Sequence, residues 1–164
     1  VQCTPQSPNC LFCPLSGSCR ALSEGKVQQL PVKQHRTKTT SRYFNYIYVR
    51  MGAHTLIHKR TEDDIWKNLF ELPLVETEKD LSEEEFLACP QFHALFAEGE
   101  VRMVRTLLRG VKHVLSHRVI YTNFYEVTLP DNSSSFSSYQ RVAVEDLGRY
   151  AVPRLIHAFL EKYV

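Results

Sequence analysis

Four of the five cysteines of this chain lie close together near its start, and no other group of residues in the sequence is better suited to chemistry. Cys3, Cys10, Cys13 and Cys19 follow the spacing C-x6-C-x2-C-x5-C. Zinc sites usually take two close pairs of cysteines, and only Cys10 and Cys13 form one. A disulfide framework would be expected to include several cysteines in the rest of the chain, which contains one, Cys89. Four thiolates from one short, proline-containing loop suit the four corners of an iron–sulfur cubane, so the spacing favours a cluster over zinc, and zinc over disulfides.

Two basic stretches are a second candidate for function. Each contains five Lys or Arg residues and no acid, namely Lys26, Lys33, Arg36, Lys38 and Arg42 in the first, and Arg102, Arg105, Arg109, Lys112 and Arg118 in the second. Between them, residues 76–85 are strongly acidic. Because the net charge is only +2, affinity for nucleic acid would depend on such local clustering. Blocks of this kind are also common as plain solvated surface.

The elements that must position these residues follow from periodicity. Aromatic and β-branched alternation predicts a strand at 43–49, and a turn at 51–54 predicts that 55–60 is its hairpin partner. Ser82 with Glu85 predicts a capping box at the start of a helix. Further elements are expected as a short strand at 69–73, helical turns at 91–97, an extended segment at 101–108 broken by Gly110, a long strand at 113–129, a short strand at 139–144 and an amphipathic helix at 152–163. The pattern predicts an α+β sandwich over residues 42–164.

The composition is that of a globular protein. Of the 164 residues 43% are hydrophobic and 23% are charged, and no apolar run approaches the roughly 18 residues of a membrane span. The chain begins with Val1 and shows no signal peptide, so we expect it to be part of a longer, intracellular protein. Three parts are predicted: a cysteine loop at 1–22, a connector at 23–41 and a folded domain at 42–164.

Five motifs in order resemble those of one family. They are the cysteine loop, the connector at 29–33, the segment at 66–73 that is similar to W-x-G-L-(x)-x-x-P, the His-Val-Leu-Ser-His segment at 113–117, and the closing stretch at 145–159. Together they resemble the C-terminal part of MutY-type A/G-specific adenine DNA glycosylases.

The resemblance implies a Nudix-like (MutT-like) α+β domain that recognises 8-oxoguanine, preceded by the loop of a [4Fe-4S] cluster bound by the four cysteines. In the segment alone, zinc could replace the cluster or the thiols could stay metal-free. The family's catalytic residues lie in its N-terminal glycosylase domain, so this part is expected not to be catalytic by itself. Implied partners are duplex DNA with 8-oxoguanine:adenine or guanine:adenine mispairs, the glycosylase domain in cis, and a partner protein at the connector. In a bacterium the location would be the cytoplasm, beside the nucleoid.

The resemblance also assigns roles to the residues at 109–118. Oxidised guanine carries an N7–H donor and a C8 carbonyl, and the hydroxyl of Ser116 can accept from the first or donate to the second. Leu115, where the family usually has an aromatic residue, would wedge into the base stack. His117 would contact a phosphate or the base. Arg109, Lys112 and Arg118 would bind phosphates without reading sequence.

A Nudix nucleotide pyrophosphohydrolase is the alternative function. Its Mg²⁺ site needs carboxylates in the pattern G-x5-E-x7-R-E-x2-E-E. The chain offers only Glu83, Glu84 and Glu85 in the corresponding region. Adjacent helix residues point about 100° apart, so these three cannot converge on one metal, and the alternative is disfavoured.

Overall fold

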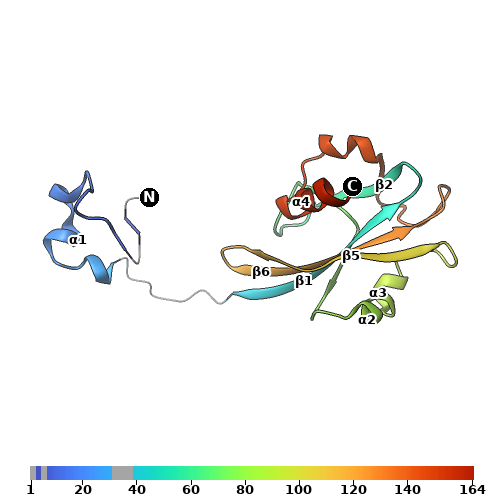
Figure 1. The fold of residues 1–164 in the computed structure, drawn as a ribbon, viewed down its shortest axis with the longest axis horizontal. Helices are drawn as coiled ribbons and strands as arrows, with labels where there is room; N and C mark the ends of the chain where they lie inside the picture. Colours follow the sequence, from blue (N-terminus) through green and yellow to red (C-terminus); the bar gives the residue numbers. More distant parts are fainter. Residues whose placement is uncertain (1–2, 5–6, 31–38) are drawn as a thin grey trace. The chain divides into compact units, whose positions relative to one another are not determined.

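The computed structural model describes residues 3–4, 7–30 and 39–164, and it divides the chain into two compact units, Val1–Lys38 and Thr39–Val164 (Figure 1). The connector residues Lys33, Arg36 and Lys38 lie outside the described residues, as does most of the connector motif at 29–33. The predicted boundaries at residues 22 and 41 therefore stay predictions.

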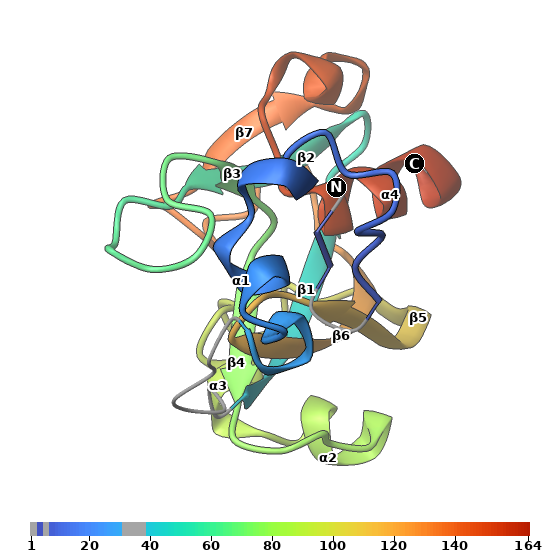
Figure 2. The same cartoon turned by 90° about the vertical axis from the view of Figure 1, so that its left-hand side faces the viewer.

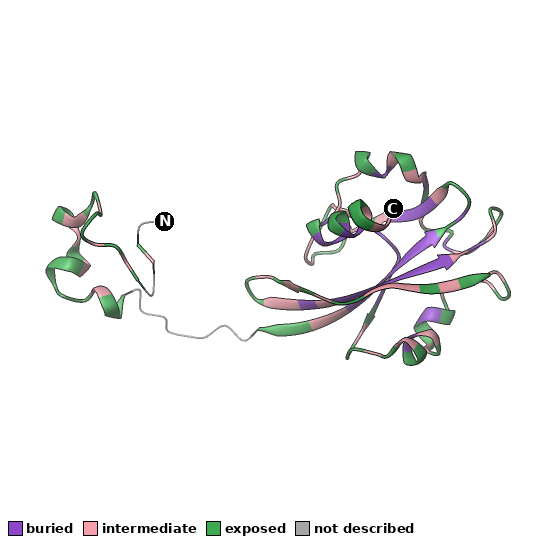
Figure 3. Cartoon of the chain, in the orientation of Figure 1, coloured by how far each residue is buried: buried purple, intermediate pink, exposed green. Residues whose placement is uncertain are grey.

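The first unit is built from turns and single helical turns. Its elements are η1 (Ser16–Ser18), α1 (Arg20–Ser23) and η2 (Val27–Gln29). None of its described side chains is fully buried, and Figure 3 colours its described residues as exposed or intermediate.

The second unit contains two sheets. The larger has the order β4-β1-β6-β5, from β1 (Thr40–Arg50), β4 (Leu74–Thr77), β5 (Met103–Val114) and β6 (Arg118–Thr128). In it β1 and β6 are parallel along their whole length, and the other pairs are antiparallel. The smaller has the order β3-β2-β7, from β2 (His54–Lys59), β3 (Phe70–Glu71) and β7 (Gln140–Ala143). The helices are α2 (Glu83–Leu87), α3 (Pro90–His93), η3 (Val144–Arg149) and α4 (Arg154–Tyr163).

The central strands β1 and β6 are buried on both faces, since alternate side chains enter two different hydrophobic clusters. On the face toward α4, Phe159 stacks on Phe124 with ring centroids 4.1 Å apart. On the other face Phe86 of α2 stacks on Tyr125, with centroids 4.4 Å apart. Figures 1 and 2 show α4 and α2 on opposite sides of the sheet. The predicted α+β class, the strand at 43–49, the capping box at Ser82 and the closing helix are confirmed.

The predicted tight turn at 51–54 is confirmed, but the predicted strand pairing between residues 43–49 and 55–60 is wrong. Only Met51 and His54 are bridged, by backbone hydrogen bonds of 3.0 and 2.9 Å, and β2 then joins β3 and β7. β1 pairs with β6 along its whole length and with β4 over residues 43–46, whereas β2 pairs with β3 and β7. The parallel partner came from far along the sequence, where periodicity alone gives no information about pairing.

Two further expectations about β5 and β6 are wrong. Gly110 does not end the strand: β5 continues through it, with register shifts between Thr106 and Val111, because Gly110 takes a φ of 69° and its N–H donates to the Asn123 side chain over 2.9 Å. The expected long strand at 113–129 is the end of β5, a turn at 115–117 and then β6. The short strand β4 was not predicted.

Candidate nucleic-acid interface and cysteine pocket

The turn at 115–117 joins two long strands and is fixed by backbone hydrogen bonds on both sides. The N–H of Leu115 donates to the carbonyl of Arg118 over 2.8 Å, and the N–H of Thr40 donates to the carbonyl of His117 over 3.2 Å. The side chains of Ser116 and His117 are exposed. An ordered backbone therefore presents two polar side chains to solvent, which is what a reading loop on a rigid scaffold requires.

The two apolar side chains before Ser116 face different ways. Leu115 is partly buried and packs against the hydrophobic core on the α4 face. Val114 is 66% exposed. The wedge role of Leu115 stays a prediction, and Val114 is a second candidate that the sequence reasoning missed. The signal that could have found it is the period of two, which places Val114 on the same face of β5 as the exposed Lys112.

The three predicted phosphate contacts differ in their surroundings. Lys112 is exposed, its Nζ lies 6.0 Å from the centre of the Tyr121 ring, and no carboxylate of the described residues is within ion-pair distance. Arg118 forms an ion pair with Asp64 beside the turn. Arg109 lies at the irregular part of β5, where it donates to the Leu81 carbonyl over 2.5 Å. The structure thus groups Lys112 and Arg118 with the turn, and it commits Arg109 to the segment that precedes α2.

Asp64, in the loop between β2 and β3, binds three arginines. Its Oδ1 pairs with Arg118, and its Oδ2 lies 2.6 Å from Arg42 Nη1 and 3.2 Å from Arg60 Nη2. Burial opposes the ionisation of Asp64, but hydrogen bonds from Arg42 and Arg118 outweigh it and hold the pKa of this carboxyl well below its usual range. The predicted connector contact Arg42 is also paired with Glu76, by two hydrogen bonds of 2.6 Å, so its guanidinium is committed within the unit.

Arg60 extends this network into the protein interior. It donates to the buried Glu71 over 2.8 Å, and Glu71 also accepts from the Tyr46 hydroxyl over 2.9 Å. Burial raises the pKa of Glu71, but hydrogen bonds from His58 and Arg60 lower it by more, so the net shift is downward. A buried carboxylate with this many donors stays ionised and anchors the cationic side chains around it.

The loop that contains Asp64 also contacts β5 through Trp66, whose ring centroid lies 5.8 Å from that of His113. Trp66 and Asn68 have φ values of 60° and 69°, in the left-handed region that non-glycine residues seldom adopt. Asn68 stands where the pattern W-x-G-L has glycine, and asparagine is the residue type that best tolerates this conformation after glycine. The motif therefore encodes the shape of this loop.

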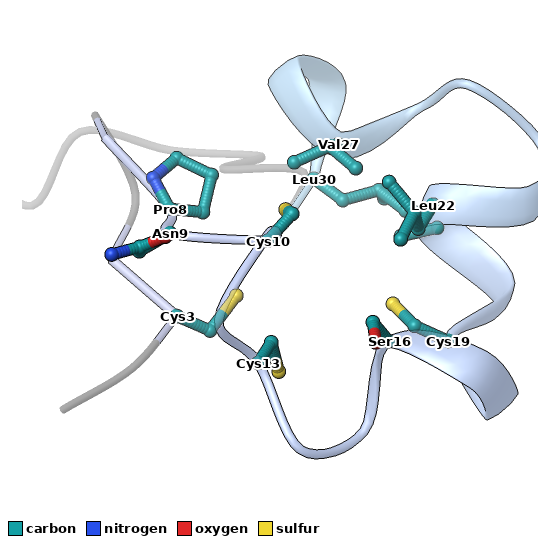
Figure 4. A pocket seen from close by; sticks show the side chains of 11 residues that line it. Cys3, Pro8, Asn9, Cys10, Cys13, Ser16, Cys19, Leu22, Val27 and Leu30 are labelled. Atoms are coloured by element: carbon teal, nitrogen blue, oxygen red, sulfur yellow. The ribbon is translucent and has the colours of Figure 1, made fainter.

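The cysteines of the first unit line one pocket, of about 340 Å³ (Figure 4). Backbone hydrogen bonds join Cys13 to Cys10, Ser16 to Cys13 and Cys19 to Ser16, over 3.0–3.3 Å. Successive turns of this kind place every third residue on one side of the chain, so Cys10, Cys13, Ser16 and Cys19 all face the pocket. Cys3 completes the set, and Leu22, Val27 and Leu30 supply apolar walls.

The four cysteines form a donor set of sulfur alone. In residues 3–4, 7–30 and 39–164, no three His, Cys, Asp or Glu side chains are close enough together to hold a single metal ion. An all-cysteine donor set with apolar walls is of the kind that an iron–sulfur cluster takes. The same finding covers Glu83, Glu84 and Glu85, of which Glu85 is used by the capping box. No helix in the described part of the chain is long and apolar enough to span a membrane.

Comparison with known proteins places this geometry in context. Residues 45–162 match the model of the NUDIX domain family. An adenine DNA glycosylase of Buchnera aphidicola subsp. Acyrthosiphon pisum is 24% identical over 98% of this chain and 44% of its own length. This chain spans less than half of each such relative, 22% and 32% for those of two other Buchnera aphidicola subspecies.

Solved structures share the fold at low identity. The C-terminal domain of mouse MUTYH, in its complex with human PCNA, superposes with a TM-score of 0.59 at 14% identity, covering 74% of this chain and 86% of that domain. A MutT structure from work on Aliivibrio salmonicida and Vibrio cholerae gives a TM-score of 0.53 at 16% identity, covering 75% of this chain and 96% of that protein. The predicted Nudix-like fold is confirmed.

Proposed function

The chain belongs to the NUDIX domain family, and from this premise we propose that it is the C-terminal part of an adenine DNA glycosylase whose folded unit reads 8-oxoguanine in duplex DNA. The parent protein would remove adenine mispaired with 8-oxoguanine or guanine. Its catalytic residues would lie in a glycosylase domain outside these residues, so the chain would bind and not cleave. The similarity to glycosylases across nearly the whole chain favours this function over nucleotide hydrolysis. In the described residues, moreover, no set of three carboxylates converges to hold Mg²⁺.

The observation that carries the proposal is the ordered turn at 115–117 with its exposed Ser116. The hydroxyl can accept from the N7–H of the oxidised base, and Lys112, His117 and Arg118 beside it can contact phosphates on either side. Val114 or Leu115 would wedge into the stack next to the lesion. Discrimination would then come from this hydrogen bond, because the N7 of unmodified guanine carries no hydrogen and cannot donate it.

Fluorescence anisotropy tests this proposal by measuring how the chain binds duplexes that carry 8-oxoguanine:adenine or guanine:adenine, at fixed, moderate salt. Wild type should prefer the oxidised duplex, and Ser116→Ala should reduce that preference by about fivefold to tenfold, the value of one hydrogen bond. Ser137→Ala, at another exposed loop serine, is the matched control and should leave the preference unchanged. Equal, salt-sensitive binding of wild type to both duplexes would contradict lesion reading by this unit.

We further propose that Cys3, Cys10, Cys13 and Cys19 bind a [4Fe-4S] cluster. Such a cluster would crosslink the loop through its four thiolates and hold it in one conformation. The turns that direct Cys10, Cys13 and Cys19 to one pocket support this assignment, as do the apolar walls of that pocket.

Iron and acid-labile sulfide, measured after anaerobic purification, test the cluster. We expect about four of each per chain. Cys13→Ser should lose most of both, whereas Cys89→Ser, which removes the one cysteine outside the group, should retain them. One zinc per chain without sulfide would contradict the assignment.

A further inference from the structure

Arg118, beside the turn at 115–117, has its guanidinium engaged by a carboxylate of another loop. It is the first residue of β6, directly after the turn, and it is predicted to bind a phosphate, yet its guanidinium is paired with Asp64. Its side chain is 38% exposed, and that of Asp64 is 21% exposed. An ion pair at this depth is shielded from solvent more than a surface pair, and it restrains both partners.

Asp64 is itself held in place from the interior side. Arg60, whose side chain is only 9% exposed, binds Asp64 with Nη2, the buried Glu71 with Nη1 and the Ile65 carbonyl with Nε over 3.0 Å. All five N–H groups of a guanidinium are coplanar, so such a set of partners fixes its orientation. The position of Asp64 is thus determined by the core and not by the turn.

Asp64 also holds the strand that pairs with the turn. Arg42 of β1 binds Asp64 over 2.6 Å, and Thr40 of the same strand donates to the carbonyl of His117. The carboxylate therefore binds both strands at this end of the sheet, β6 through Arg118 and β1 through Arg42. The turn that carries Ser116 directly precedes Arg118, and its His117 carbonyl accepts the hydrogen bond from Thr40 of β1.

We propose that Asp64 is a positioning residue that holds the turn at 115–117 in its lesion-reading conformation by pairing with Arg118 of β6, the residue directly after the turn, and with Arg42 of the adjacent strand β1. The inference rests on the proposed function for its consequence, but the order of the turn is measurable without DNA. Asp64 contacts no base in this scheme. It acts through Arg118, whose ion pair with Asp64 fixes the backbone beside Ser116.

Hydrogen exchange of the 164-residue chain gives the first readout. The amides of Leu115 and Thr40 are hydrogen-bonded on either side of the turn. Asp64→Asn, which keeps the shape and removes the charge, should accelerate exchange at both by about tenfold, while amides in the centre of β1 and β6 stay protected. Asp63→Asn is the matched control: the Asp63 side chain is 98% exposed and, among the described residues, pairs only with Lys67, so the exchange should not change. Unchanged exchange at Leu115 and Thr40 in Asp64→Asn overturns the proposal.

DNA binding gives the second readout and separates positioning from general damage. Asp64→Asn should lower the preference for the 8-oxoguanine:adenine duplex about fivefold, yet bind the guanine:adenine duplex as tightly as wild type or more tightly, since one negative charge is gone. Loss of affinity for both duplexes in parallel would indicate structural damage and count against the proposal. A turn that loosens while wild type itself shows no preference would leave the positioning intact and refute lesion reading.

Arg118→Met covers the case in which Asp64→Asn does not fold. It removes only the link to the turn, and Asp64 keeps Arg42 and Arg60. Exchange at Leu115 should rise about tenfold here as well. If Leu115 stays protected in this variant, the ion pair does not position the turn.

Discussion

Among the described residues of Val1–Lys38 no side chain is buried, whereas Thr39–Val164 buries aromatic and aliphatic side chains on both faces of β1 and β6. Small units without a core normally depend on metals or disulfides, because apolar burial cannot offset the entropy of ordering the chain. The difference teaches that one polypeptide can combine two sources of order. In the first unit a bound group would supply it, and in the second the hydrophobic effect does.

Removal of the proposed cluster should have the largest effect and should be confined to the first unit. After chelation or in Cys13→Ser, residues 7–30 should become sensitive to protease, since the four-ligand crosslink is lost. The melting midpoint of the second unit should not move. Limited proteolysis with mass spectrometry reads the first outcome and circular dichroism the second. Equal protease resistance with and without the cluster would break the comparison.

Phe159→Ala tests the second unit in the same way. Phe159 is 2% exposed and stacks on Phe124, so its truncation leaves a cavity that should lower the free energy of unfolding by about 3–5 kcal/mol. Urea denaturation followed by fluorescence measures this cost. Iron and sulfide content should stay at the wild-type level, and a parallel loss of both would mean that the two units are not independent.

Acid should weaken the second unit through Asp64. Its pKa is held below the ordinary value of about 4, so the folded state takes up the proton less readily than the unfolded one. This contribution is complete above pH 4 and is lost as the pH falls below it. Asp64→Asn should cost about 1–3 kcal/mol at pH 7 and flatten the acid dependence of the free energy of unfolding.

The flattening should be incomplete, because other carboxylates act in the same direction. Hydrogen bonds from Ser133 and Ser135 lower the pKa of Glu100 to about 2, and the pKa of Glu71 is also lowered. Urea titrations at pH 7, 5, 4 and 3 would show the difference. Identical slopes in wild type and Asp64→Asn would contradict the role of this ion-pair network in stability.

Asn68 should give the smallest effect. Asn68→Gly should be neutral or stabilise by up to about 1 kcal/mol, because glycine adopts a φ of 69° without strain, and Asn68→Ala should cost about 1 kcal/mol. Thermal melts of the two variants measure the difference. A glycine variant less stable than the alanine variant would show that the asparagine side chain, and not the backbone angle, matters here.

Local signals predicted the elements, and distant pairing limited the prediction. The strand at 43–49, the capping box at Ser82 and the closing helix depend on residues near in sequence, and all three are confirmed. The partner of β1 lies beyond residue 117, so the hairpin with β2 was assigned wrongly. For the site, motif order led to Ser116, but the commitment of Arg109 and Arg42 to internal partners depends on three-dimensional neighbours that no spacing reveals.

The parallel pairing of β1 with β6 has a consequence for how the molecule forms. Thr40 pairs with Arg118 and Arg50 with Thr128, so every contact of this ladder joins residues far apart in the chain. Loop closure of that length is slow, and folding should be limited by this step. During synthesis β1 leaves the ribosome long before β6 exists, with apolar side chains on both faces. A chaperone that shields residues 44–49 in that interval should raise the yield of folded protein.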